Sequence, residues 1–173
     1  MNTKKTIAVL AIAMAVAFVA TVGMASAEVL ETKTLWAGQN IDAGTVTVSN
    51  DGTYINITYA EITDGWELTA YHVYVSTVEA PTKSAPGKFQ YKGDVDPADT
   101  PITVQTIDSP DCDETIHIAA HAELQKYLYT TEEGVEIYQY ESGWASGGDT
   151  DDVRISPGKN WATYFEVTIP CEP

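Results

Sequence analysis

The chain has 173 residues, of which 25 are acidic and only nine are basic, so its formal charge at pH 7 is −16. A polyanion of this strength repels nucleic acid and anionic membrane surfaces, and neither is an expected partner. The length corresponds to one domain of ordinary size, large enough to bury its own hydrophobic core.

The first 27 residues have the three parts of a cleavable signal peptide. Two lysines precede an apolar run over residues 7–22, and Ala27 ends an Ala-Ser-Ala sequence whose small side chains suit a peptidase. The run is about 16 residues long, shorter than the roughly 20 that a membrane-spanning helix needs, which favours cleavage over a retained anchor. We therefore predict a signal peptide over 1–27, a single domain over 28–173, no membrane insertion after cleavage, and a secreted or cell-surface location.

The exported part is dominated by period-two alternation of apolar residues, which is typical of strands. Residues 45–48 and 54–59 alternate in this way, and Asp51-Gly52 between them favours a tight hairpin. Further strands are predicted at Trp66–Val78, Thr100–Ile107, Thr115–Leu124, Gly134–Tyr140 and Trp161–Ile169. Strands separated by Pro-, Gly- and Asp-rich connections predict an all-β, antiparallel β-sandwich of the immunoglobulin-like or jelly-roll-like kind.

Residues 113–128 also fit an amphipathic helix. On a helix His117 and His121 would lie one turn apart, a spacing that can chelate a metal ion. On a strand they share a face but stand about 13 Å apart, too far to share an ion. We favour the strand, with Ile116 and Ile118 facing the core, and this makes the two histidines packing or surface residues.

The two cysteines, Cys112 and Cys171, predict one disulfide, because an even pair in an exported protein is most simply oxidised. The bond would close a loop of about 59 residues and would stabilise the fold by roughly 4 kcal/mol on the chain-entropy model. Since Cys171 is third from the end of the sequence, the bond would also hold the last strand in place.

We expect no catalytic activity. The sequence contains no Gly-x-Ser-x-Gly elbow, no His-Glu-x-x-His motif and no Gly-rich phosphate loop. Pairs of carboxylates, which glycosidases use, occur by chance in so acidic a chain and are therefore interpreted as solvated surface groups.

Tryptophans close to glycines suggest a second class of function, carbohydrate binding. Trp36, Trp66 and Trp144 are the candidate ligand-binding aromatics, since rings near loops can stack on sugars while Asp and Asn bind the hydroxyls. Trp161 opens a strand that continues to Tyr164 and Phe165, and we expect it to be part of the core instead.

An acidic loop predicts a calcium ion with a stabilising role. Asp149, Asp151 and Asp152 offer the hard oxygen ligands that calcium prefers, as do the aspartates of residues 94–99. Neither segment has the spacing of an EF-hand loop, and solvated acidic loops are the alternative interpretation.

Asn56-Ile57-Thr58 is an acceptor sequence for N-glycosylation. Because Asn56 alternates with two isoleucines, its side chain is expected to face the solvent and to be available for modification.

Several blocks of the sequence resemble a widespread set of small exported β-sandwich modules. The blocks are Trp36–Gln39 with Gly44–Val48, Asp64–Trp66, Tyr71–Val75, Pro86–Tyr91, Ile116–Ala122, Glu141–Trp144 and Pro157–Phe165. The Ala-Ala-His-Ala and Gly-Lys-Asn-Trp-Ala-Thr-Tyr-Phe sequences are the most specific of them. The chain departs from the pattern at residues 123–127, where a valine-rich stretch is expected, and at Glu141-Ser142-Gly143-Trp144, which replaces Glu-Thr-Ala-Trp. The resemblance implies an extracellular setting, but no reaction and no ligand.

These observations predict a secreted, non-enzymatic structural or adhesive protein of the cell surface or extracellular matrix. Such a protein reaches its place by association, either with itself or with envelope polysaccharide or protein. Strand addition through Glu28–Leu35 is one route to self-association. The alternative is an extracellular carbohydrate-binding module that calcium stabilises.

Overall fold

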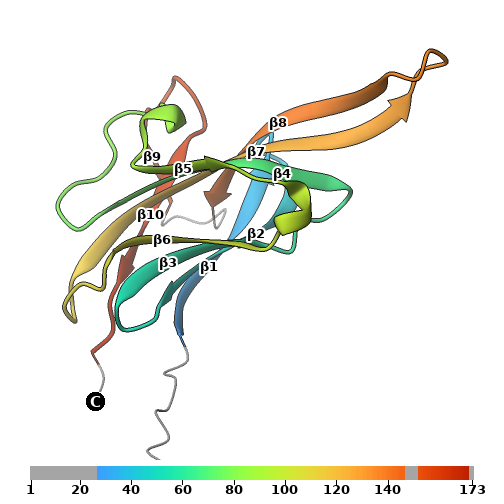
Figure 1. Ribbon diagram of the computed structural model, residues 1–173. Helices are drawn as coiled ribbons and strands as arrows, with labels where there is room; N and C mark the ends of the chain where they lie inside the picture. The colour runs from blue at the N-terminus through green and yellow to red at the C-terminus, as the bar shows by residue number, and fades with distance from the viewer. Residues whose placement is uncertain (1–26, 147–151, 172–173) are drawn as a thin grey trace, which may run out of the picture.

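The structure is a computed structural model that describes residues 27–146 and 152–171 (Figure 1). The predicted signal peptide lies outside these ranges except for Ala27, which directly precedes the first strand. Within the described ranges, no helix has both the length and the hydropathy to cross a membrane.

The described residues form ten strands and two single-turn 3-10 helices. The strands are β1 (Glu28–Ala37), β2 (Ile41–Asn50), β3 (Tyr54–Ala60), β4 (Trp66–Ser76), β5 (Tyr91–Asp94), β6 (Ile102–Asp108), β7 (Thr115–Thr130), β8 (Glu136–Ser146), β9 (Val153–Arg154) and β10 (Thr163–Thr168), and the short helices are η1 (Pro86–Lys88) and η2 (Pro97–Asp99). Every strand pair is antiparallel, which confirms the all-β, antiparallel prediction.

The strands follow the order β5-β4-β7-β8-β1-β2-β3-β6, and β10 extends the sheet beside the first part of β7. The sheet curls, so that β4 near one end contacts β6 at the other. In Figure 1 the half that contains β1, β2, β3 and β6 therefore faces the half that contains β4, β5 and β7. The curl gives the sheet an inner face and an outer face.

The main hydrophobic core fills the space between the two halves. Alternate residues of each strand point inward, and the largest fully buried side chains include Val46, Ile55, Ile57, Tyr59, Leu68, Val73, Ile116, Ile118 and Leu124. Each buried aliphatic side chain stabilises the fold by roughly 1.5–3 kcal/mol relative to exposure. This main core lies on the inner face of the sheet.

Residues 115–130 form the long strand β7, so the strand interpretation of this segment is confirmed and the helical one is wrong. Ile116 and Ile118 lie in the core, as predicted. The strands β1, β5 and β9 were not predicted. Residues 28–37 pair with β2, and partly with β8, so Glu28–Leu35 is part of the sheet.

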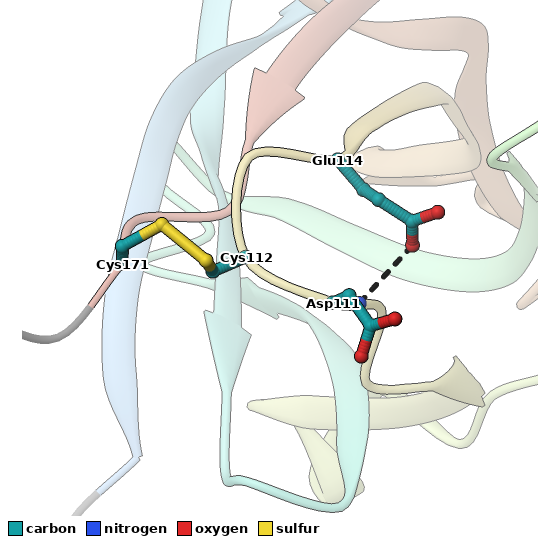
Figure 2. Close-up of a disulfide and its surroundings, with 4 residues drawn as sticks. All are labelled: Asp111, Cys112, Glu114 and Cys171. Carbon is teal, nitrogen blue, oxygen red and sulfur yellow. Dashed lines mark hydrogen bonds between the residues drawn. A yellow bond between two sulfur atoms is a disulfide. The ribbon is translucent and has the colours of Figure 1, made fainter.

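Cys112 and Cys171 form the predicted disulfide, which joins the loop before β7 to the segment after β10 (Figure 2). Two main-chain hydrogen bonds extend the β7–β10 ladder toward it, from Asp113 N to Ile169 O and from Ile169 N to Glu114 O, each 2.9 Å long. Figure 2 also shows the Glu114 carboxylate accepting a hydrogen bond from the main-chain N–H of Asp111. The end of the described chain is therefore tied to the sheet.

The tip of the β7–β8 hairpin projects away from the rest of the sheet as an arm (Figure 1, orange). Pairing of β7 with β4 ends at Lys126, and pairing of β8 with β1 begins at Gly143. In the described ranges, residues 127–130 of β7 pair only with β8, and residues 136–142 of β8 pair only with β7. Large apolar side chains are exposed here: Tyr127, Leu128, Tyr129, Val135 and Tyr140.

Candidate functional site

Three aromatic rings lie in one row across the outer face of β4, β7 and β8. His72 is directly opposite His121, and His121 is directly opposite Trp144. Directly paired residues of antiparallel strands have their Cβ atoms about 4.5–5.5 Å apart, so their side chains touch. The His121 ring packs edge-on against Trp144, with 4.8 Å between the ring centroids. Strand register alone therefore brings together residues 49 and 23 positions apart in the sequence.

Two further rows continue along the same face. Glu123 pairs with Ser142, and Gln125 pairs with Tyr140. The Gln125 amide donates a hydrogen bond of 2.8 Å to Glu67 of β4, which holds the third row in place. The outer face is thus aromatic at one end and polar toward the hairpin arm.

Two covering segments pack on the aromatic end. Phe89, Ala119, Trp144 and Ala162 form a second hydrophobic cluster, with Tyr74, Ile155, Trp161 and Tyr164 packed against it. The side-chain amide of Asn160 donates a hydrogen bond to Ser84 Oγ across 2.6 Å, and Ser84 in turn donates to Ser156. These bonds tie the segment before η1 to the segment before β10.

Between the covering segments and the polar rows lies an open groove of about 760 Å³. Its floor contains His72, His121 and Trp144, and its walls contain Ser84, Glu123, Gln125, Tyr140, Ser142, Asn160 and Trp161. A volume of this size falls in the range of small-molecule sites, and mixed aromatic and polar linings are typical of them. The groove is therefore our candidate functional site.

A chain of hydrogen bonds crosses the floor of the groove. Ser142 Oγ lies 2.6 Å from Nε2 of His121, and Nδ1 of His121 lies 3.2 Å from Nδ1 of His72. The main-chain carbonyl of His121 accepts a hydrogen bond of 2.9 Å from Tyr59, which reaches it through the core. His121 is only 5% exposed, so contacts on every side hold its ring.

Both imidazoles of the floor favour their neutral form. Burial, and to a smaller extent the neighbouring His72, lowers the pKa of His121 to about 3. Burial is also the largest cause that lowers the pKa of His72, where Glu123 and Asp94 oppose it and Lys92 adds to it. A neutral imidazole offers one lone pair, either for a hydrogen bond or for a metal ion.

A serine hydroxyl beside an imidazole is also the arrangement that nucleophilic catalysis uses. A general base works best when its pKa lies near the working pH. The low pKa of His121 makes it a weak base for Ser142.

The four tryptophans differ from the predicted pattern. Trp66 is 5% exposed, belongs to the main core and lines a separate cavity of about 420 Å³, so its role in ligand binding stays a prediction. Trp144 is almost as buried but forms part of the groove floor. Trp161, which was expected in the core, is only partly buried and lines the groove. Trp36 lines a smaller cavity of about 280 Å³ that also touches Trp161, and its Nε1 donates to Ser146 O.

The predicted calcium loop is only partly described. Asp149 and Asp151 lie outside the described residues. Asp152 has its Oδ1 3.6 Å from Lys33 Nζ, and its Oδ2 accepts a hydrogen bond from Ser146. In the described ranges, one group of three or more His, Cys, Asp or Glu side chains lies within metal-binding range, Cys112, Asp113 and Cys171, and its sulfurs are in the disulfide. The calcium prediction therefore stays a prediction.

Asn56 is buried, at 6% exposure, so the expectation that it faces the solvent was wrong. Its strand β3 lies between β2 and β6. Its amide donates to Asp51 Oδ2 across 2.8 Å and to Tyr54 O across 3.3 Å. In the folded protein this side chain is engaged by the hairpin turn.

His72 and Ser142 were not predicted as site residues. Each looks like an ordinary strand residue in the sequence, and only the register across β4, β7 and β8 places them beside His121. The sequence nevertheless contained a signal that could have located the groove. Five of the sequence blocks that carry the resemblance contribute residues to this groove: Tyr71–Val75, Pro86–Tyr91, Ile116–Ala122, Glu141–Trp144 and Pro157–Phe165.

No protein-family model, no curated protein and no solved structure matches the chain.

Proposed function

We propose that the protein is exported after cleavage at Ala27, folds as a β-sandwich, and acts without catalysis as an adhesive binding protein at the cell surface. Its outer-face groove would hold a segment of an uncharged glycan. The observation that carries the proposal is the groove itself, which combines exposed aromatic rings with convergent polar side chains.

The aromatic rings supply stacking surfaces. Tyr140 is 69% exposed at one end of the groove, and Trp161 is partly exposed where the covering segment meets it. Flat rings with accessible faces suit the apolar faces of sugar rings, and aromatic side chains contribute much of the energy at binding sites in general.

The polar side chains supply hydrogen bonds for sugar hydroxyls. Glu123 accepts, whereas Asn160, Gln125 and Ser84 both donate and accept. Asn160 and Gln125 are themselves held by hydrogen bonds to Ser84 and Glu67, so part of the site is preorganised. Preorganisation lowers the entropy cost of binding.

The net charge of the chain indicates which class of glycan the groove would bind. The net charge is −16, and Glu123 lies in the groove itself. Anionic polysaccharides, such as uronates or sulfated chains, would be repelled by this field. Neutral glycans are therefore favoured over acidic ones.

A glycan array followed by calorimetric titration of the best neutral oligosaccharide tests the proposal. Trp161→Ala and Tyr140→Ala should each weaken binding at least tenfold, because each removes a stacking surface. Tyr129→Ala is the matched control, since Tyr129 is also exposed, at 56%, but lies on the hairpin arm and does not line the groove. Binding that survives both groove substitutions, or a preference for acidic glycans, would contradict the proposal.

Self-association is the second candidate, and the hairpin arm is the observation that favours it. Both edges of the arm carry main-chain groups that, in the described ranges, have no neighbouring strand. Free edges with exposed apolar side chains can pair with another strand, and a second copy of the chain offers a matching arm. Glu132, Glu133 and Glu136 would repel their counterparts in that copy, so association should strengthen with salt.

Sedimentation equilibrium at low and high ionic strength tests this candidate. The protein should form dimers or larger assemblies in high salt, and Leu128→Glu together with Tyr129→Glu should return it to a monomer. Val78→Glu is the control, because Val78 is exposed but lies outside the arm. A wild-type protein that stays monomeric at high salt and high concentration would contradict self-association through the arm.

A further inference from the structure

The two histidines of the groove floor face each other with their Nδ1 atoms 3.2 Å apart. One neutral imidazole can donate its N–H to the other at this distance. The same distance suits a second arrangement, because two nitrogens bound to one tetrahedral zinc ion at about 2.0–2.1 Å stand about 3.3 Å apart. The rings therefore already have the spacing of two ligands of a single metal ion.

Strand register accounts for this spacing. His72 of β4 and His121 of β7 are directly paired on the outer face, so their Cα positions are set by the sheet and not by a loop. Ligands placed on sheet strands are held more closely than ligands on loops. The ring centroids are 5.2 Å apart and the rings are tilted by 54°, so they meet through their edges and not by stacking.

The surroundings of His121 also suit a metal ligand. A metal-bound histidine usually donates its second ring N–H to an oxygen, which fixes the tautomer and the direction of the ring. Ser142 Oγ lies 2.6 Å from Nε2 of His121 and can accept that N–H, which leaves the lone pair of Nδ1 directed at His72. Trp144 supports the ring from its side.

Acidic side chains near His72 attract a cation. The groups that act on His72 from the packed elements are Glu123 of β7 and Asp94 of β5, both acidic, and Lys92 of β5, which opposes them. The overall negative charge adds to the attraction.

We propose that His72 and His121 bind one divalent transition-metal ion through their Nδ1 atoms, with the remaining coordination positions open to the groove. Imidazole ligands select zinc or copper over calcium and magnesium. Water fills the open positions, and Glu123, two residues from His121 on the same face, lines the same groove. This site is distinct from the predicted calcium loop and does not depend on glycan binding.

Calorimetric titration of the metal-stripped protein with ZnCl₂ and with CuCl₂ at pH 7.5 tests the proposal. We expect one saturable site for at least one of the two ions and no saturable binding of calcium at these histidines. His72→Ala should weaken binding at least tenfold. Ser142→Ala should weaken it about tenfold, the usual effect of losing a group that orients a ligand.

His117→Ala is the matched control, because His117 is the remaining one of the three histidines in the sequence and its Nδ1 lies 3.1 Å from Glu166 on β10, outside the groove. It should leave zinc and copper binding unchanged. Since His121 is buried and its replacement could prevent folding, the decisive variant is His72→Ala, whose side chain is partly exposed. Wild-type affinity in His72→Ala, or the absence of saturable zinc and copper binding in the wild-type protein, would overturn the proposal.

Discussion

The hydroxyl of Tyr59 donates a hydrogen bond to the main-chain carbonyl of His121, with 2.9 Å between the two oxygens. Tyr59 belongs to β3 and is fully buried, whereas His121 belongs to β7 on the opposite half of the sheet. Burial raises the pKa of Tyr59, so the hydroxyl remains a donor at ordinary pH. This bond joins the main core to the floor of the groove.

Tyr59→Phe should lower the free energy of unfolding by about 1–3 kcal/mol, because it removes the buried donor while keeping the ring. Urea unfolding followed by tryptophan fluorescence measures the change. Tyr129→Phe is the control, since the Tyr129 hydroxyl is on the exposed arm, and its effect should stay within about 0.5 kcal/mol. Equal effects of the two substitutions would show that the bond across the core does not stabilise the fold.

Acid should destabilise the protein partly through His121. Its pKa falls from 6.5 in the unfolded chain to about 3 in the folded one, so between these values the unfolded state binds a proton that the folded state does not. Stability from this group is therefore complete above pH 6.5 and is lost as the pH falls, by about 2 kcal/mol between pH 7 and pH 5. The lowered pKa of His72 acts in the same direction.

Urea unfolding at pH 7 and pH 5 tests whether stability falls with pH as expected. His121→Gln should be less stable than the wild-type protein at pH 7, but it should lose about 2 kcal/mol less on going to pH 5. The acidic residues contribute equally to both proteins and cancel in the comparison. His117→Gln serves as the control. A pH dependence unchanged by His121→Gln would mean that this imidazole is not held neutral by the fold.

Lys33 and Asp152 form an ion pair with little exposure to water. The two side chains are 8% and 5% exposed, and Nζ lies 3.6 Å from Oδ1. Lys33→Met removes the cation that faces a buried carboxylate and should cost about 3 kcal/mol, measured by urea unfolding. Lys88→Met, at an exposed position, should change stability by less than about 0.5 kcal/mol. A cost below about 1 kcal/mol at Lys33 would contradict the prediction.

The disulfide should stabilise the fold by constraining the unfolded chain. Its loop spans 59 residues, which corresponds to roughly 4 kcal/mol. The double variant Cys112→Ser with Cys171→Ser should lose most of this stability in chemical denaturation. Hydrogen exchange should also rise selectively at Val167 and Ile169, because the bond holds the end of β10 against β7. Uniform exchange along the whole sheet would instead indicate a global effect only.

Much of the fold was readable from local pattern. Strict alternation in Tyr54–Tyr59 and an Asp-Gly turn predict the β2–β3 hairpin, since side-chain period and turn chemistry are properties of neighbouring residues. The cysteine pair predicted the disulfide for a similar reason, because only one pairing exists. The three missed strands are short, or lie in segments without clear alternation, and pairing with neighbours forms them.

The candidate site was less predictable. Trp66 and Trp161 both lie near a glycine, yet one is buried in the main core and the other lines the groove. Trp66 begins β4 and packs in the core, whereas Trp161 belongs to a covering segment that packs on the outer face. Neither placement is a local property of the sequence.

By itself, then, the sequence determined an antiparallel, all-β chain with one disulfide and a strongly negative net charge. The tertiary structure decided that His72, His121, Ser142 and Trp144 meet, because register between strands far apart in the chain sets which side chains are opposite each other. It also decided that Asn56 is enclosed and that the Glu28–Leu35 strand is already paired. Alternation assigns a residue to a face of its own strand, but only the pairing of strands assigns it neighbours.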